Sequence, residues 1–302
     1  MKLRIEQCGL HYFDRNTGLH LLFDEIKATE CEYSLAPRTF SIAITDDCNS
    51  NCYFCHVNKG KNYLPKEFVI DISKKVDVLG CFDIAIGGGE PLLHPDLTEI
   101  CHTIWNETKL GISITTNGKL LNDSIIESLT GNISFIRISI DSPNEENYLK
   151  IRGFPLKTMR ENINKLTNKI PFGVNMVVTK DTIYELDEML EFALDIGAKE
   201  LLLLPYIERG KITLANNLMK KLEDWLFTNY VKFPIKVLEQ AREFLNVPVL
   251  FGDSRYYQDY LYISAQKYLQ RSSYSNEGYL LEINSFENLL KDWRKEILMK
   301  SI

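Results

Sequence analysis

The chain has 302 residues and a mass of 34.9 kDa, with 45% hydrophobic and 25% charged residues. This composition is typical of a folded globular protein and excludes a disordered or fibrous chain. The net charge is −6, from 35 basic and 41 acidic residues without a long run of either sign, so we expect no duplex nucleic acid as a partner.

No apolar run approaches the ~18 residues that a membrane span needs. The opening residues, MKLRIEQCGLHYFDR, lack the apolar core of a secretory signal. We therefore expect a cytoplasmic protein with no membrane partner.

Residues 1–38 form the first predicted unit, an accessory segment. Apolar and polar residues alternate in LRIEQC and in LHYFD, and LHLLF follows the turn sequence Asn16-Thr17-Gly18. This pattern predicts a small β-meander with a turn at Gly18.

Residues 39–209 alternate short apolar runs with amphipathic segments. The runs are too apolar for one-sided antiparallel strands and predict buried parallel strands over 39–45, 82–87, 111–116, 133–140, 172–178 and 200–204. The segments between them are long enough for right-handed crossover helices, over 67–80, 94–109, 122–130, 159–169 and 183–197. Six such units are two short of a closed barrel, so we expect an α/β fold with a partial (β/α)6 TIM-like barrel, open on one side.

Residues 210–302 break this rhythm and predict a small α+β appendage. Helical patterns cover 216–230, 235–245 and 285–298. Short strand patterns cover 247–252, 259–264, 268–273 and 278–283.

All seven cysteines lie in the first third of the chain: Cys8, Cys31, Cys48, Cys52, Cys55, Cys81 and Cys101. An odd number in a cytoplasmic protein speaks against a disulfide framework and for a metal or cluster. Cys48, Cys52 and Cys55 form a Cx3Cx2C motif directly after the first barrel strand. A cubane [4Fe–4S] cluster usually takes four thiolates, so three would leave one iron open. A zinc site with His56 as the fourth ligand is the alternative.

This motif, with the aromatic Phe54 before its third cysteine, resembles that of the radical S-adenosylmethionine (SAM) superfamily. The resemblance covers about residues 39–209 and extends to the ends of later strands, where barrel enzymes place their chemistry. The matching segments are Gly87-Gly88-Gly89-Glu90-Pro91, Thr115-Thr116-Asn117-Gly118, Ser139-Ile140-Asp141-Ser142, Tyr148–Gly153 and Val174–Val178.

The resemblance implies one [4Fe–4S] cluster, bound by Cys48, Cys52 and Cys55, whose open iron is chelated by SAM. In this superfamily one electron cleaves SAM to a 5′-deoxyadenosyl radical, which takes hydrogen from an unactivated carbon. The protein supplies binding, orientation and exclusion of side reactions. The cofactor-binding residues implied by the resemblance are Phe54, Gly87, Gly88, Gly89, Glu90, Thr116, Ser139, Arg152 and Asn175.

Some of these residues have more specific implied roles. The backbone of Phe54 is expected at the adenine, Ser139 at the ribose and Arg152 at the SAM carboxylate. Gly88 and Gly89 are expected to let the backbone approach the methionine moiety, because no Cβ intervenes. An ion pair on a helix surface is the alternative for Arg152.

Residues 259–294 resemble the SPASM or twitch extension of the same superfamily, in which cysteines bind auxiliary clusters. Lys267 and Ser272 stand where that family shows a glycine and then a cysteine, and Ser254 stands at an upstream ligand position. Since serine is not a cluster thiolate, the resemblance implies that auxiliary clusters are lost. A β-hairpin with core tyrosines is the plainer interpretation. The remaining cysteines, Cys8, Cys31, Cys81 and Cys101, are expected to pack as small hydrophobic residues.

SPASM-like relatives often modify ribosomal peptides, so the resemblance favours a peptide substrate, with a sugar, nucleotide or other small metabolite as the alternative. Tyr206, Glu208 and Arg209 follow the sixth strand and face the expected active end, although ordinary loop polarity also accounts for them. A reducing partner such as flavodoxin or ferredoxin is implied. A non-catalytic iron–sulfur or regulatory protein is the alternative of another class. The sequence assigns no catalytic residue, no bond formed or broken, and no oligomeric state.

Overall fold

The computed structural model describes residues 1–26, 28–29, 32–208, 211–247, 260–275 and 277–299. Its centre is a series of parallel strands: β4 (Thr39–Thr45), β5 (Asp83–Gly88), β6 (Gly111–Thr116), β7 (Phe135–Ser139), β8 (Phe172–Val178) and β9 (Leu201–Pro205). Each strand pairs in parallel with the next. The predicted strands are confirmed, and their burial explains why they are apolar almost throughout.

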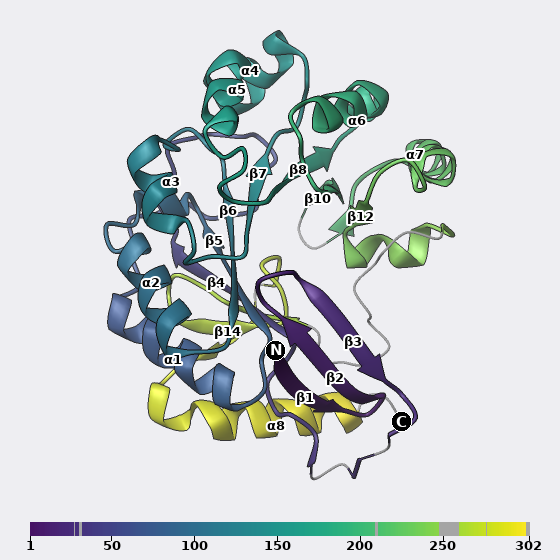
Figure 1. The fold of residues 1–302 in the computed structure, drawn as a ribbon. Helices are drawn as coiled ribbons and strands as arrows, with labels where there is room; N and C mark the ends of the chain where they lie inside the picture. Colours follow the sequence, from purple (N-terminus) through teal and green to yellow (C-terminus); the bar gives the residue numbers. More distant parts are fainter. Residues whose placement is uncertain (27, 30–31, 209–210, 248–259, 276, 300–302) are drawn as a thin grey trace.

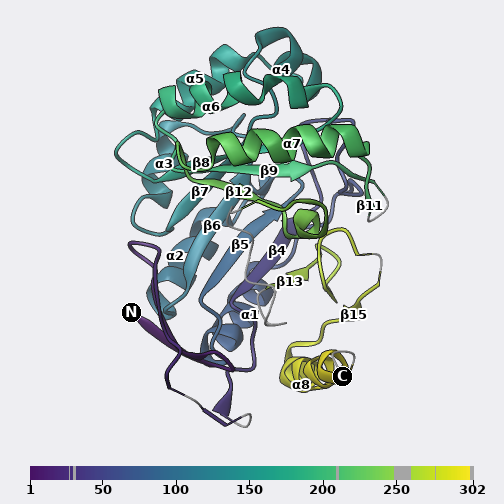
Figure 2. The ribbon, with the colours of Figure 1, turned by 90° about the vertical axis from the view of Figure 1, so that its right-hand side faces the viewer.

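The helices between these strands form an outer layer around the curved sheet (Figure 1, Figure 2). In α1 the buried Phe68, Val69, Ile72 and Val76 recur every three or four residues, so one stripe faces the sheet. The helices are α1 (Lys66–Val78), α2 (Leu97–Glu107), α3 (Asp123–Leu129), α4 (Glu145–Arg152), α5 (Leu156–Asn164) and α6 (Leu186–Asp195), with 3₁₀ turns η2 (Pro91–Leu93) and η3 (Thr182–Glu185).

The N-terminal segment is the expected antiparallel β-meander, with strands β1 (Lys2–Glu6), β2 (Gly9–Asp14) and β3 (Leu19–Phe23). Gly18 in the turn has a φ of 70°, which favours glycine. The meander docks at the start of the barrel strands, where Phe13 packs on Phe82 with ring centroids 5.3 Å apart. The buried Arg4 donates hydrogen bonds to the carbonyls of Ala36 and Gly80.

The C-terminal part contributes strands to both ends of the central sheet. Its elements are a hairpin of β10 (Ile207–Glu208) and β11 (Lys211–Ile212), α7 (Asn216–Asn229), β12 (Ile235–Val237), η4 (Glu239–Phe244), β13 (Tyr260–Ile263), β14 (Tyr268–Gln270), β15 (Tyr279–Leu280), η5 (Ile283–Ser285) and α8 (Phe286–Met299). The full order is β12-β9-β8-β7-β6-β5-β4-β13-β14-β15, and within the described chain the sheet does not close into a barrel. The predicted partial barrel is therefore confirmed.

The helix predicted over 235–245 is wrong. Ile235 and Val237 alternate inward as β12 and pair in parallel with β9, because that strand would otherwise leave its backbone edge unpaired. The 3₁₀ turn η4 takes up the rest of the expected helix. Most of the strand predicted over 247–252 lies outside the described residues.

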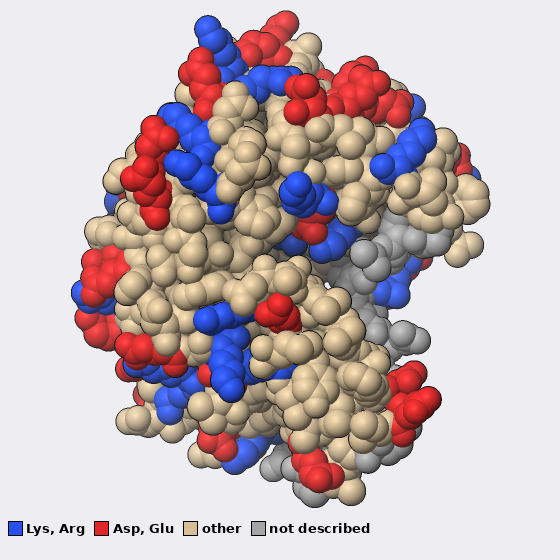
Figure 3. Space-filling model, in the orientation of Figure 1, with Lys and Arg blue, Asp and Glu red and all other residues tan. Residues whose placement is uncertain are grey.

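Among the described residues, no helix combines the length and the apolar character needed to cross a bilayer. Acidic and basic side chains are interspersed over the face shown in Figure 3, without a large area of one sign. This even distribution agrees with the charge balance of the sequence.

Glu6 gives the docked meander a pH-dependent stability. Burial raises the pKa of its carboxyl, but Arg38, His11 and Arg4 together outweigh burial and hold this pKa well below its usual value of 4.5. A lowered pKa in the folded state stabilises the fold fully above about pH 4.5, and this contribution is lost as the pH falls further.

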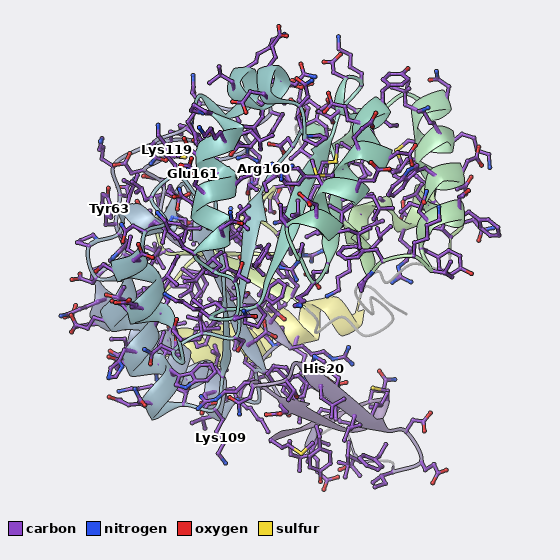
Figure 4. The ribbon with its side chains drawn as sticks, turned by 45° about the horizontal axis from the view of Figure 1, so that its top comes forward. His20, Tyr63, Lys109, Lys119, Arg160 and Glu161 are labelled. Atoms are coloured by element: carbon purple, nitrogen blue, oxygen red, sulfur yellow. The ribbon has the colours of Figure 1, made fainter. Side chains whose placement is uncertain are left out.

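Glu6→Gln is therefore expected to lower the free energy of unfolding by about 3 kcal/mol at pH 7, because it leaves two arginines without their buried anion. The difference from the native protein should shrink below pH 4.5, as measured by urea denaturation. Glu161→Gln, an exposed residue on α5 (Figure 4), is the matched control and should change little. A Glu6→Gln deficit that persists unchanged to low pH would contradict the assignment.

Candidate functional site

A cavity of about 250 Å³ lies toward the carboxyl ends of the barrel strands and is called here the inner cavity. The residues predicted from the sequence converge on it from the loop after β4, from the ends of β5, β6 and β7, from the middle of β8 and from the last turn of α4. Those that line it are Cys48, Cys52, Phe54, Cys55, Gly87, Gly88, Gly89, Thr116, Ser139, Arg152 and Asn175. Glu90 is the exception and does not line the cavity.

The cysteine loop, residues 46–64, has no helix or strand of its own and is held by side chains from other elements. Asn117, after β6, donates to Oδ1 of Asn49 at 2.7 Å and to Oγ of Ser50 at 3.2 Å. Lys59 donates to Oδ1 of Asn51 at 2.9 Å and to the carbonyl of Ser50. Asn49 and Ser50 are therefore held from outside the loop by Asn117, and Ser50 and Asn51 are held from within it by Lys59.

Cys48 and Cys52 are partly withdrawn from solvent, while Cys55 is exposed. Burial raises the pKa of Cys48, and it raises that of Cys52 despite the opposing charge of Arg152. Metal binding at these positions must therefore displace protons from the sulfurs.

The packing of the surrounding backbone requires glycine at positions 88 and 89. Gly88 has a φ of 119°, and a Cβ there would lie 2.1 Å from the carbonyl oxygen of Thr45. A Cβ on Gly89 would lie 2.1 Å from the carbonyl oxygen of Asp47. The end of β4 and the start of the cysteine loop thus occupy the space that a side chain would need, and the expected approach of SAM to both glycines stays a prediction. At Gly87, in contrast, a Cβ would meet no atom within 4 Å.

Glu90 lies behind the cavity wall and not at its surface. Its fully buried carboxylate accepts hydrogen bonds from the hydroxyl of Thr116 at 2.7 Å, the N–H of Asn117 at 2.7 Å and the N–H of Leu92 at 3.0 Å. Burial raises the pKa of this carboxyl, and the donors act against that shift. Glu90 fixes the turn from which Asn117 holds the cysteine loop, and its expected role in cofactor binding stays a prediction.

Arg152 points into the site from the last turn of α4, which ends at Gly153 with a φ of 77°. Its Nε lies 2.5 Å from Oδ2 of the fully buried Asp141, and its Nη1 lies 3.5 Å from Sγ of Cys52. The guanidinium carbon is 5.9 Å from the ring centroid of Phe54. The alternative of an ion pair on a helix surface is therefore wrong.

Asn175 presents an unused acceptor to the cavity. It is 8% exposed, and its Oδ1 is buried without a hydrogen-bond partner. It pairs in register with Ser139 on the neighbouring strand, so the two side chains lie side by side in the wall. A buried acceptor without a partner is costly unless a ligand satisfies it.

A zinc site with His56 is not supported by the geometry. No group of three His, Cys, Asp or Glu side chains in the described part of the chain is arranged to hold one metal ion. His56 instead packs on the ring of Tyr274, with ring centroids 4.3 Å apart. A cubane distributes its thiolates over different irons, so its cysteines need not converge on one point.

The C-terminal part supplies wall residues that sequence reasoning missed. Tyr260 and Tyr262, two residues apart on β13, line the cavity together with Ser273 and Tyr274. In the sequence, Asn117 is identified only as part of the segment Thr115–Gly118, and its role in holding the cysteine loop is not predicted. No local signal identifies the tyrosines, because they reach the site only through the pairing of β13 with β4.

A second cavity of about 660 Å³ adjoins the first and is called here the outer cavity. It lies between the cysteine loop, the β14 region and the segment after β9. Both cavities share residues from these three places, including Phe54, Cys55, His56, Tyr206 and Tyr274. Tyr206 and Glu208 line it as expected near the active end, while Arg209 lies outside the described residues.

The family model of the Radical SAM superfamily matches residues 42–193. The chain belongs to the radical SAM superfamily. The match begins in β4 and ends in α6, so it spans the cysteine loop and strands β5 to β8, while β9 and the C-terminal part lie outside it.

Sequence relatives include proteins named probable GTP 3',8-cyclase. One from Methanococcus vannielii is 30% identical over 174 residues, covering 55% of this chain and 58% of the relative. Another, from Methanosarcina mazei, is 30% identical over 233 residues, covering 69% of this chain and 68% of the relative. The chain thus spans little more than half the length of the first of these relatives.

Solved structures resemble the fold over nearly the whole chain. Streptococcus suis SuiB bound to precursor peptide SuiA has a TM-score of 0.72 and 15% identity, covering 95% of this chain and 87% of SuiB. SuiB bound to S-adenosylmethionine has a TM-score of 0.75 and 14% identity, covering 97% of this chain and 86% of SuiB. At this identity the likeness shows the fold alone. The SPASM-like character of the extension stays a prediction.

Members of the radical SAM superfamily, to which the chain belongs, use a [4Fe–4S] cluster and SAM. The residues present fit both: three cysteines line one wall, Asn175 offers an unpaired acceptor, and Gly87 borders open space. Held by these residues, the two cofactors would supply radical chemistry at the inner cavity. Cys8, Cys81 and Cys101 are buried as expected, and Cys31 lies outside the described residues.

The glycines offer a matched test of the inner cavity. Gly87→Leu is expected to fold normally and to weaken SAM binding at least about tenfold, because the side chain enters the cavity. Gly89→Ala should instead lower the Tm, because its Cβ collides with Asp47. Thermal denaturation and equilibrium dialysis with SAM, on proteins with equal iron content, measure the two effects. Normal SAM affinity in folded Gly87→Leu would show that SAM lies elsewhere.

Proposed function

We propose that Cys48, Cys52 and Cys55 bind the [4Fe–4S] cluster, that SAM occupies the inner cavity, and that the substrate enters through the outer cavity. The substrate that we propose is a ribosomally made peptide. The observation that carries this proposal is the outer cavity itself, which adjoins the cysteine loop and is more than twice the volume of the inner one.

The chemistry of the outer cavity supports a peptide. Its lining includes aromatic rings and uncharged polar groups, among them Tyr53, Tyr268 and Gln270. Asp46 and Glu208 are its charged members, and no Lys or Arg lines it among the residues that the structure describes. Triphosphates are usually bound by arginine, lysine or a metal, whereas aromatic and amide groups suit peptide side chains and backbone. SuiB, whose fold is similar, is bound to a precursor peptide in its structure.

A nucleotide substrate is the second candidate, and the names of the sequence relatives favour it. The sequence match to the first of these relatives covers little more than half of this chain. The support for peptide chemistry comes from the outer cavity, whose wall combines matched residues of the cysteine loop with residues of the extension that lie outside the match. In either case we expect electrons from a reducing protein such as flavodoxin or ferredoxin.

Reductive cleavage of SAM tests the enzymatic part of the proposal. Anaerobically reconstituted protein should hold about four irons and, with dithionite, should convert SAM to 5′-deoxyadenosine. Changing any one of Cys48, Cys52 or Cys55 to Ala should abolish turnover, because two thiolates hold a cubane poorly. Cys101→Ala, at a buried cysteine in α2, is the matched control and should keep the activity. A fully loaded protein that forms no 5′-deoxyadenosine would indicate a non-catalytic iron–sulfur protein.

The substrate class is tested by competition between peptides and nucleotides. Short peptides encoded by reading frames next to this gene are the candidates to test: a true substrate should raise the rate of 5′-deoxyadenosine formation and gain a mass change, while GTP should do neither. Glu208→Lys in the outer cavity should weaken peptide stimulation without changing SAM cleavage in the absence of substrate. If the protein converted GTP and the peptide had no effect, the peptide assignment would be overturned and the nucleotide favoured.

A further inference from the structure

Arg152 divides its hydrogen bonds between a carboxylate and a cysteine sulfur. Its Nε and Nη2 each lie 2.5 Å from Oδ2 of Asp141. Its Nη1 donates to Sγ of Cys52 at 3.5 Å. Arg152 is 8% exposed and Asp141 is fully buried, so this pair lies almost entirely within the protein.

The direction of the guanidinium is fixed by its surroundings. Oδ1 of Asp141 accepts a hydrogen bond from the N–H of Val177 at 2.9 Å, which ties the carboxylate to β8. The ring of Phe54 lies on another side, with its centroid 5.9 Å from the guanidinium carbon. Because a planar guanidinium held at two nitrogens cannot turn freely, its third nitrogen is directed at the sulfur of Cys52.

We propose that Arg152 is a positioning residue that sets the reduction potential of the cluster through the sulfur of Cys52. Potentials of iron–sulfur clusters depend on net charge and on hydrogen bonds to the sulfurs. Reduction adds one negative charge, so an N–H donor carrying a positive charge stabilises the reduced state and raises the potential. Asp141 offsets part of that charge and holds the donor in place.

This role differs from the contact with the SAM carboxylate that the sequence implies. Three of the five N–H groups of arginine are used by Asp141 and Cys52, which leaves two for a ligand. The contact with Cys52 is made between two residues of the chain, so its effect on the potential is measured without SAM. The inference rests on the proposed cluster ligands and not on the identity of the substrate.

The test is a redox titration of the reconstituted protein, followed by electron paramagnetic resonance, without SAM or substrate. Arg152→Met is expected to lower the equilibrium constant for reduction at least tenfold, about 59 mV for one electron. This variant leaves Asp141 buried without its cation, which threatens folding. The double variant Arg152→Met/Asp141→Asn removes both charges, and its potential should lie below the native value and above that of Arg152→Met.

Arg160→Gln is the matched control. Arg160 lies on α5 (Figure 4) and forms an exposed ion pair with Asp195 at 2.8 Å, away from the inner cavity. Its loss should leave the potential unchanged. A native potential in the double variant, at an iron content of about four, would overturn the proposal. The proposal would also be overturned if the Arg152 variants bound SAM more weakly but kept the native potential, measured without SAM. Arg152 would then act on SAM alone.

Discussion

Three buried carboxylates hold the cysteine loop, and the rest of the site depends on this arrangement. Asp46, at the base of the loop, accepts hydrogen bonds from the backbone and side chain of Asn62 and from Gln266 of the extension. Glu90 acts from the end of β5 through the turn after β6, and Asp141 acts from the end of β7 through an arginine. Backbone hydrogen bonds fix only the base of this irregular loop, so buried charge-assisted hydrogen bonds from the strand ends support the rest. The sheet thus positions the thiols indirectly.

Much of this organisation follows from the sequence, because it depends on local patterns. The buried strands are apolar runs, and the Cx3Cx2C spacing and the strand-end motifs mark one end of the barrel. The individual roles were harder to predict, because a motif gives a residue type without its direction. Gly88 and Glu90 belong to the same short motif, yet one makes room for the end of β4 and the other is a buried anchor.

Long-range pairing explains what the sequence did not reveal. Ile235–Val237 resembles a helix start when read alone, and it is a strand because β9 offers it an edge. The tyrosines of β13 reach the inner cavity because this strand continues the sheet beside β4. Extension and barrel therefore share one sheet and one pair of cavities, so a change in the extension alters the surroundings of Cys55 as directly as a change in the barrel.

The pairing of β13 with β4 also has a consequence for biosynthesis. Thr39 lies opposite Tyr260, so the first barrel strand leaves the ribosome roughly 200 residues before its neighbour on that side. Contacts at this separation close late, since the loop-closure entropy must be overcome first. The cysteine loop is consequently uncovered on the extension side throughout most of translation. The loop is therefore more accessible on the nascent chain than on the finished protein.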